Sequence, residues 1–130
     1  MQTSLEIVKK AYELLALKDI EGYLQILDES VVVTQSPCLP WGGRHMGIEG
    51  ALAFIKLVKT HIDSQVFIEQ FVVAGEKICV IGRTKGVVLT NQKHFDCRLV
   101  HIWSVSNGKI NGLDVFIEDA VMLSALCRNE

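Results

Sequence analysis

The stretch from Lys93 to Ile117 constrains the fold of this chain more than any other part of the sequence. It consists of two long runs rich in β-branched and aromatic residues, which flank the dipeptide Asn107-Gly108. Asparagine and glycine tolerate two successive positive φ angles, and the tightest hairpin turn requires both, so this is a strong hairpin signal. We therefore expect two long antiparallel strands joined at Asn107-Gly108.

The composition bounds what such a chain can be. With 130 residues, 49% of them apolar and 22% charged, we expect one globular domain over residues 1–130. A formal net charge of -2 predicts neither a nucleic-acid nor a membrane partner. The N-terminal residues lack the basic and then apolar pattern of a signal peptide, which favours a cytoplasmic protein. No cysteine or histidine spacing is typical of a metal site, so we expect no metal and no cofactor.

The first part of the chain is predicted to be helical. Thr3 and Glu6 have the spacing of a capping box, and apolar residues at helical spacing follow as far as Lys18. Asp19 is a natural N-cap for a second, short helix. A short β run at residues 31–34 and a loop at residues 36–43, which holds both prolines, lead into a further helix at residues 47–61.

The second part of the chain is predicted to be strands. Two of them, at residues 65–74 and 77–90, precede the hairpin, and Asp119 is expected to cap a last short helix. Helices followed by an antiparallel meander predict an α+β fold. Because long antiparallel strands twist and curl, we expect a strongly curved antiparallel sheet wrapped around the N-terminal helices, with a cavity between them.

Four segments carry a resemblance to a known family: Leu-Lys-Asp-Ile-Glu-Gly at 17–22, Pro-Trp-Gly-Gly-Arg-His-Met-Gly at 40–47, His-Ile-Trp at 101–103 and Asn-Gly-Lys-Ile at 107–110. From about residue 5 to 126 the chain resembles the SnoaL-like branch of the nuclear transport factor 2-like superfamily. The resemblance implies a cone-shaped α+β barrel of the cystatin-like kind. It also implies a ligand pocket at the open end and a homodimer formed through the sheet.

The family's enzymes are not matched at their catalytic positions. The ketosteroid isomerase related to this fold uses an Asp base, a Tyr and a second Asp, and the matching positions here hold Ser36, Ala11 and His101. The last-strand Asp of the polyketide cyclases matches Val115, and Asp114 lies one residue earlier. A shift of one residue points a strand side chain to the opposite face, so we expect Asp114 to face away from the pocket unless a bulge intervenes.

His101 is the first candidate for a functional side chain, because strand alternation should point it into the cone with Leu99 and Trp103. Arg83 and Tyr12 are the expected helpers. The alternatives are a histidine of the pocket wall or core, and a solvated end for the strand that carries Arg83. The expected lining of an apolar ligand pocket is Trp41, Trp103, Leu99, Ile81, Val115, Ile117, Leu15 and Val58.

Two functions therefore follow from the sequence. One is a metal-independent isomerase, cyclase, hydrolase or dehydratase that acts on an apolar small molecule by acid–base chemistry. The other is a non-catalytic ligand-binding or dimeric interaction protein with the same cone. They differ in whether at least two polar groups converge on one point of the pocket.

Overall fold

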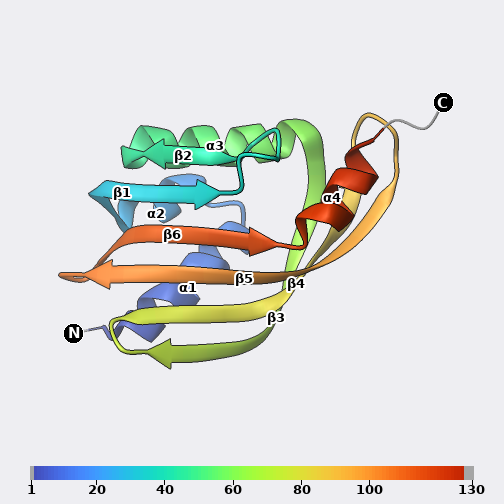
Figure 1. Cartoon of the computed structure of the whole chain (residues 1–130). Coiled ribbons are helices and arrows are strands. Elements are labelled where there is room, and N and C mark those ends of the chain that lie inside the picture. The colour runs from blue at the N-terminus through green and yellow to red at the C-terminus, as the bar shows by residue number, and fades with distance from the viewer. Residues whose placement is uncertain (1, 128–130) are drawn as a thin grey trace.

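The structure is a computed structural model that describes residues 2–127. It consists of a curved six-stranded sheet with helices α1, α2 and α3 on one face and α4 at one end (Figure 1). The elements in chain order are α1 (Ser4–Ala16), α2 (Ile20–Gln25), β1 (Leu27–Gln35), β2 (Gly43–Met46), α3 (Gly47–His61), β3 (Ile62–Ala74), β4 (Lys77–Val88), β5 (His94–Ser106), β6 (Lys109–Ile117) and α4 (Asp119–Leu126). The predicted α+β class is confirmed.

The two N-terminal helices begin where the sequence places them. The Thr3 side chain accepts a hydrogen bond from the Glu6 backbone N–H, and the Glu6 side chain accepts one from the Thr3 N–H, which completes the predicted capping box. Asp19 caps α2 by accepting from the Gly22 N–H at 2.9 Å. Lys18 joins the two helices with a φ of 59°, which turns the chain so that both helices pack on the sheet.

The predicted hairpin forms the centre of the sheet. Strands β5 and β6 pair antiparallel, with Ser106 opposite Lys109 at the turn. Asn107 and Gly108 have φ angles of 52° and 78°, the pair of positive values that the dipeptide was expected to provide. This local signal therefore accounts for the pairing of two central strands of the sheet.

The strand order is β2-β1-β6-β5-β4-β3, and one pair differs from the expected antiparallel meander. Strands β1 and β6 are parallel, with Gln35 opposite Val115, while the other four pairs are antiparallel. Strand β1 forms a hairpin-like pair with β2, and the last strand of the C-terminal meander then pairs with the free edge of β1 in the same direction. The fold is therefore a mixed sheet.

The sheet curves because its ladder is interrupted. An extra residue interrupts the pairing at Glu69 in β3 and at Asn111 in β6, and such irregularities bend a strand and increase its twist. The inner, concave face packs on α1, α2 and α3 (Figure 1).

Buried side chains on this inner face form two apolar clusters. The first cluster contains Val8, Val80 and Trp103, and the second contains Trp41, Phe95 and Met122. The second cluster lies at the end of the sheet where α4 packs against β5.

Helix α4 begins differently from the prediction. Asp119 is the first residue of the helix, and the flanking residue is Glu118, whose side chain does not cap the helix. The Glu118 carboxylate instead accepts the Arg98 backbone N–H, so it is committed to the neighbouring strand. Among the helices described, none is long and apolar enough to cross a membrane.

Candidate functional site

The centre of the candidate site is a chain of three side chains on the inner face of the sheet. Trp103 and His101 are two residues apart on β5 and both point inward, and Tyr12 reaches them from α1. The Trp103 Nε1–H donates to Tyr12 Oη at 2.8 Å, and Tyr12 Oη lies 2.6 Å from His101 Nδ1. The sequence prediction that His101 faces inward with a nearby Tyr12 therefore agrees with the structure.

These two hydrogen bonds favour one tautomer of His101. An indole N–H can only donate, so Tyr12 Oη accepts from Trp103. If Oη also accepted from a protonated Nδ1, the hydroxyl hydrogen of Tyr12 would have no acceptor among residues 2–127. The arrangement that leaves fewer groups unpaired is therefore donation from the Tyr12 hydroxyl to His101 Nδ1. A neutral imidazole that accepts at Nδ1 carries its hydrogen on Nε2. The chain of contacts therefore leaves His101 with one free donor, the Nε2–H.

Burial keeps this group of side chains uncharged. Loss of hydration lowers the pKa of His101 from its ordinary 6.5 to about 4, and burial raises the pKa of Tyr12 far above its usual range. At neutral pH the site therefore presents neutral hydrogen-bond donors and no ionised group of its own.

The surroundings of His101 supply no acceptor for that donor. Its neighbours across the sheet are Val80 and Val115, and its neighbours along the inner face of β5 are Leu99 and Trp103. Among residues 2–127, no hydrogen-bond partner is found for His101 Nε2, and the residue keeps 9% of its surface accessible. Because Nε2 is not fully enclosed, this donor is open to an acceptor from outside the chain.

Two further polar residues share the inner face, and the sequence analysis missed both. Gln35 and Thr84 are each 7% exposed. Gln35 follows Val31 and Val33 at the same alternating positions of β1, and that parity was the signal that could have placed it inside. The Trp41 Nε1–H donates to Gln35 Oε1 at 2.9 Å.

Arg83 is not part of this site, contrary to the prediction. The inner face of β4 is formed by Ile78, Val80, Gly82 and Thr84, which leaves Arg83 and Ile81 on the outer face. Both faces of this strand carry apolar residues, so the alternation in the sequence did not distinguish them.

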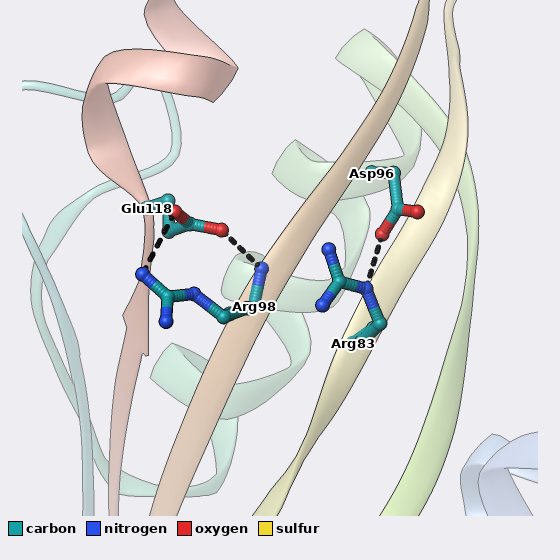
Figure 2. Close-up of polar contacts among 4 residues, drawn as sticks. All are labelled: Arg83, Asp96, Arg98 and Glu118. Atoms are coloured by element: carbon teal, nitrogen blue, oxygen red, sulfur yellow. Dashed lines mark hydrogen bonds and ion pairs between the residues drawn. The ribbon is translucent and has the colours of Figure 1, made fainter.

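On the outer face, Arg83 forms an ion pair. Its Nε donates to Asp96 Oδ1 at 2.7 Å (Figure 2). Beside it, Arg98 pairs with Glu118 at 3.3 Å, and the two arginines lie opposite each other on β4 and β5 (Figure 2). Each guanidinium thus has a carboxylate partner, which leaves neither arginine free to act inside the cone.

The other residues of the expected pocket do not line one common site. Ile81 is 36% exposed on the outer face, so its assignment to the pocket is wrong. Trp103, Val115 and Leu15 belong to the first apolar cluster or pack on it, and Trp41 and Val58 belong to or pack on the second. Ile117 packs on both clusters, and buried Leu99 belongs to neither.

Asp114 faces away from the site, which settles an orientation that the sequence left open. It lies opposite Thr34 on β1 and accepts a hydrogen bond from the Thr34 hydroxyl. Val115, its neighbour, points inward and lies beside His101. No bulge reverses this parity, so this carboxylate is not available in the cone.

Two surface grooves lie outside the cone, and neither contains a residue of the predicted site. One has a volume of about 640 Å³ between α4 and the loop after β4, and the other has a volume of about 580 Å³ beside the turns at Gly75 and Asn107. Within residues 2–127 there is no group of three or more His, Cys, Asp or Glu side chains that could hold a metal ion.

Comparison with family models assigns the chain to a protein family. The model of the SnoaL-like domain matches residues 8–112, so this protein belongs to the SnoaL-like domain family. No curated protein matches the sequence.

Solved structures share the fold along nearly the whole chain. An NTF2-like protein of unknown function from Burkholderia pseudomallei is 26% identical with a TM-score of 0.90, and the match covers 98% of this chain and 100% of that one. TerC co-crystallised with polyporic acid is 19% identical with a TM-score of 0.85, covering 94% and 96%. A candidate polyketide cyclase from Pseudomonas putida is 17% identical with a TM-score of 0.79, covering 98% and 100%.

Proposed function

We propose that this protein binds an uncharged, apolar small molecule inside the cone and that His101 Nε2–H donates a hydrogen bond to a carbonyl-type oxygen of that ligand. The observation that carries the proposal is the directed chain from Trp103 through Tyr12 to His101 Nδ1, which leaves one free donor in an apolar wall. The family membership supports a small-molecule role, and a protein of the same fold has been co-crystallised with polyporic acid.

The neutral side chains of His101 and Tyr12 favour an uncharged ligand. His101 and Tyr12 are both neutral at pH 7, and Arg83 is paired with Asp96 on the other face. A carboxylate ligand would lose its hydration without gaining a cationic partner, which costs far more than one hydrogen bond returns. A ketone, quinone or similar neutral acceptor loses little, so it is the class that the site favours.

The same geometry supports a limited kind of catalysis. A histidine with a pKa of about 4 is a poor acid or base at neutral pH, but its neutral N–H can polarise a carbonyl group. Tyr12 orients the ring and replaces the carboxylate that often does so. Any isomerase, cyclase or dehydratase activity would then depend on donation from Nε2 and not on proton transfer by the imidazole.

Binding of a simple aryl ketone tests the proposal. We expect 2-acetylnaphthalene to bind the protein, with a dissociation constant that rises about tenfold in His101→Phe, the loss of one hydrogen bond of about 1.4 kcal/mol. The matched control is His94→Phe, because His94 lies on the same strand with an exposed side chain. Titration calorimetry measures both. Failure of the ketone to bind, or equal affinity in all three proteins, would contradict the proposal.

The outer face of the sheet supports a second role, a homodimer. Phe116 is 55% exposed, and Val100 and Ile81 are each 36% exposed. These three residues lie side by side across β6, β5 and β4. The ion pairs of Figure 2 border one side of this apolar row, because Arg83 and Arg98 lie two residues from Ile81 and Val100 on the same strands. An exposed apolar row of this kind is a surface that a second copy of the chain could cover.

A further inference from the structure

We infer that the cone holds a second donor for the same ligand, the side-chain amide of Gln35, and that the ligand is therefore an elongated apolar molecule with two neutral acceptors. This inference rests on the proposed function and adds the second contact point and the spacing between the two. Neither Gln35 nor a ligand with two acceptors follows from the family assignment.

Gln35 is held in one orientation by a tryptophan, whereas His101 is held by Tyr12. The Trp41 Nε1–H donates to Gln35 Oε1 at 2.9 Å, and Trp41 is 2% exposed, so the amide oxygen is committed. The amide nitrogen, Nε2, is consequently directed away from Trp41. Among residues 2–127 no hydrogen-bond partner is found for this Nε2. Trp41 thus orients Gln35 directly, Trp103 orients His101 through Tyr12, and Gln35 and His101 each keep a free N–H donor.

The two donors belong to one row across the inner face. Gln35 on β1 lies opposite Val115 on β6, and Val115 lies opposite His101 on β5. All three side chains are buried on the concave side. Neighbouring strands are about 4.8 Å apart, so the Cα atoms of Gln35 and His101 are about 10 Å apart. Val115 provides an apolar floor between the two donors.

Leu99 lies next to His101 along the inner face of β5, is 3% exposed and belongs to neither apolar cluster. Its neighbour across the sheet is Gly82, where the Phe67 backbone oxygen occupies the place of a side chain. Gln35, Thr84 and His101 each keep 7–9% of their surface accessible although they face inward. Among residues 2–127, Asn111 Oδ1 is the one side-chain N or O atom that is fully enclosed and has no hydrogen-bond partner. The unpaired nitrogens of Gln35 and His101 are therefore not fully enclosed, and each borders accessible space.

These observations define the ligand class. The ligand has a flat or rod-shaped apolar body that lies on Val115 and Leu99, with one carbonyl-type oxygen near His101 and a second near Gln35. Thr84 lies further along the same face, and its hydroxyl can accept as well as donate.

A matched pair of ketones tests the inference. The probes are 2,6-diacetylnaphthalene, with two carbonyl groups, and 2-acetylnaphthalene, with one. We expect the wild-type protein to bind the diketone about tenfold more tightly than the monoketone. Gln35→Met, which keeps the length of the side chain without its amide, should abolish this preference and change the monoketone affinity by less than about twofold. Titration calorimetry measures all four constants.

Two further variants distinguish loss of the Gln35 amide from a general effect of substitution on folding. Gln65→Met makes the same replacement at an exposed position on the outer side of β3, and it should leave the preference unchanged. Trp41→Phe keeps an aromatic ring but removes the N–H that orients Gln35, and it should reduce the preference. Thermal unfolding followed by circular dichroism establishes that each variant is folded.

The outcomes separate this inference from the proposed function. If Gln35→Met keeps the preference for the diketone, or if the wild type has no such preference, Gln35 is not a second donor. Weaker binding of both ketones by His101→Phe would still support His101 as the first donor. If the wild type binds neither ketone, the proposed function fails and the second donor fails with it.

Discussion

At the scale of single residues, Tyr12 connects α1 to the sheet through two hydrogen bonds. Its hydroxyl accepts a hydrogen bond from Trp103 and shares a second with His101 Nδ1. Tyr12→Phe should therefore lower the free energy of unfolding by about 1–3 kcal/mol, because it leaves two buried groups unpaired. Tyr23→Phe is the control, since Tyr23 is buried but makes no side-chain hydrogen bond with the described residues. Urea denaturation measures both, and equal losses would contradict the assigned contacts.

The buried imidazole of His101 predicts how stability depends on pH. Its pKa is about 4 in the folded protein and 6.5 in the unfolded chain, so between these values the unfolded state binds more protons. The contribution of His101 to the free energy of unfolding should therefore be greatest above pH 6.5 and decrease as the pH falls toward 4, by roughly 3 kcal/mol in total. In His101→Phe the slope between pH 5 and 6.5 should decrease. A variant with the wild-type slope would show that His101 is not the group responsible.

At the scale of elements, the β5–β6 turn tests how far local conformation supports the sheet. Gly108 has a φ of 78° and open space around its Cα, so Gly108→Ala meets no clash but adopts a strained backbone. We expect a loss of about 1 kcal/mol in the free energy of unfolding. Ser106→Ala, at an exposed position at the end of β5, should change the free energy of unfolding by less than about 0.5 kcal/mol. Thermal and urea denaturation distinguish the two variants.

Strand β4 shows why side-chain parity was the hardest feature to predict at this scale. Ile78 and Val80 point inward and Cys79 and Ile81 point outward, so both faces of the strand read as apolar. What selects the face is the pairing of Val80 with His101, on a strand whose own alternation is clear. Arg83 was placed on the inner face by mistake for this reason, because the residues beside it on β4 are apolar on both faces and do not show which face is buried.

At the scale of the whole molecule, the outer apolar row predicts association. We expect the protein to sediment as a dimer and Phe116→Glu to raise the dissociation constant of that dimer at least about tenfold, because a carboxylate would be buried without a partner. Leu17→Glu is the control, since Leu17 is 77% exposed at the end of α1, away from the sheet face. Sedimentation equilibrium measures both. A monomeric wild type, or no effect of Phe116→Glu, would exclude this surface as the interface.

The sequence by itself determined the elements whose signals are local. The capping box at Thr3, the cap at Asp19 and the Asn107-Gly108 turn each depend on residues within a few positions of one another, so each was predictable without the rest of the fold. The inward parity of Leu99, His101 and Trp103 followed from strict alternation within one strand.

The tertiary structure alone decided the composition of the site. Tyr12 and His101 are 89 positions apart in sequence and meet because α1 packs on the sheet. Gln35 joins their row only because β1 pairs in parallel with β6, an arrangement that no local pattern encodes. Trp41 and Trp103 were expected in one wall, but each instead orients a different polar side chain. Pairing between distant strands depends on contacts that are formed only when the whole sheet is assembled, and for that reason the candidate site could be predicted only in part.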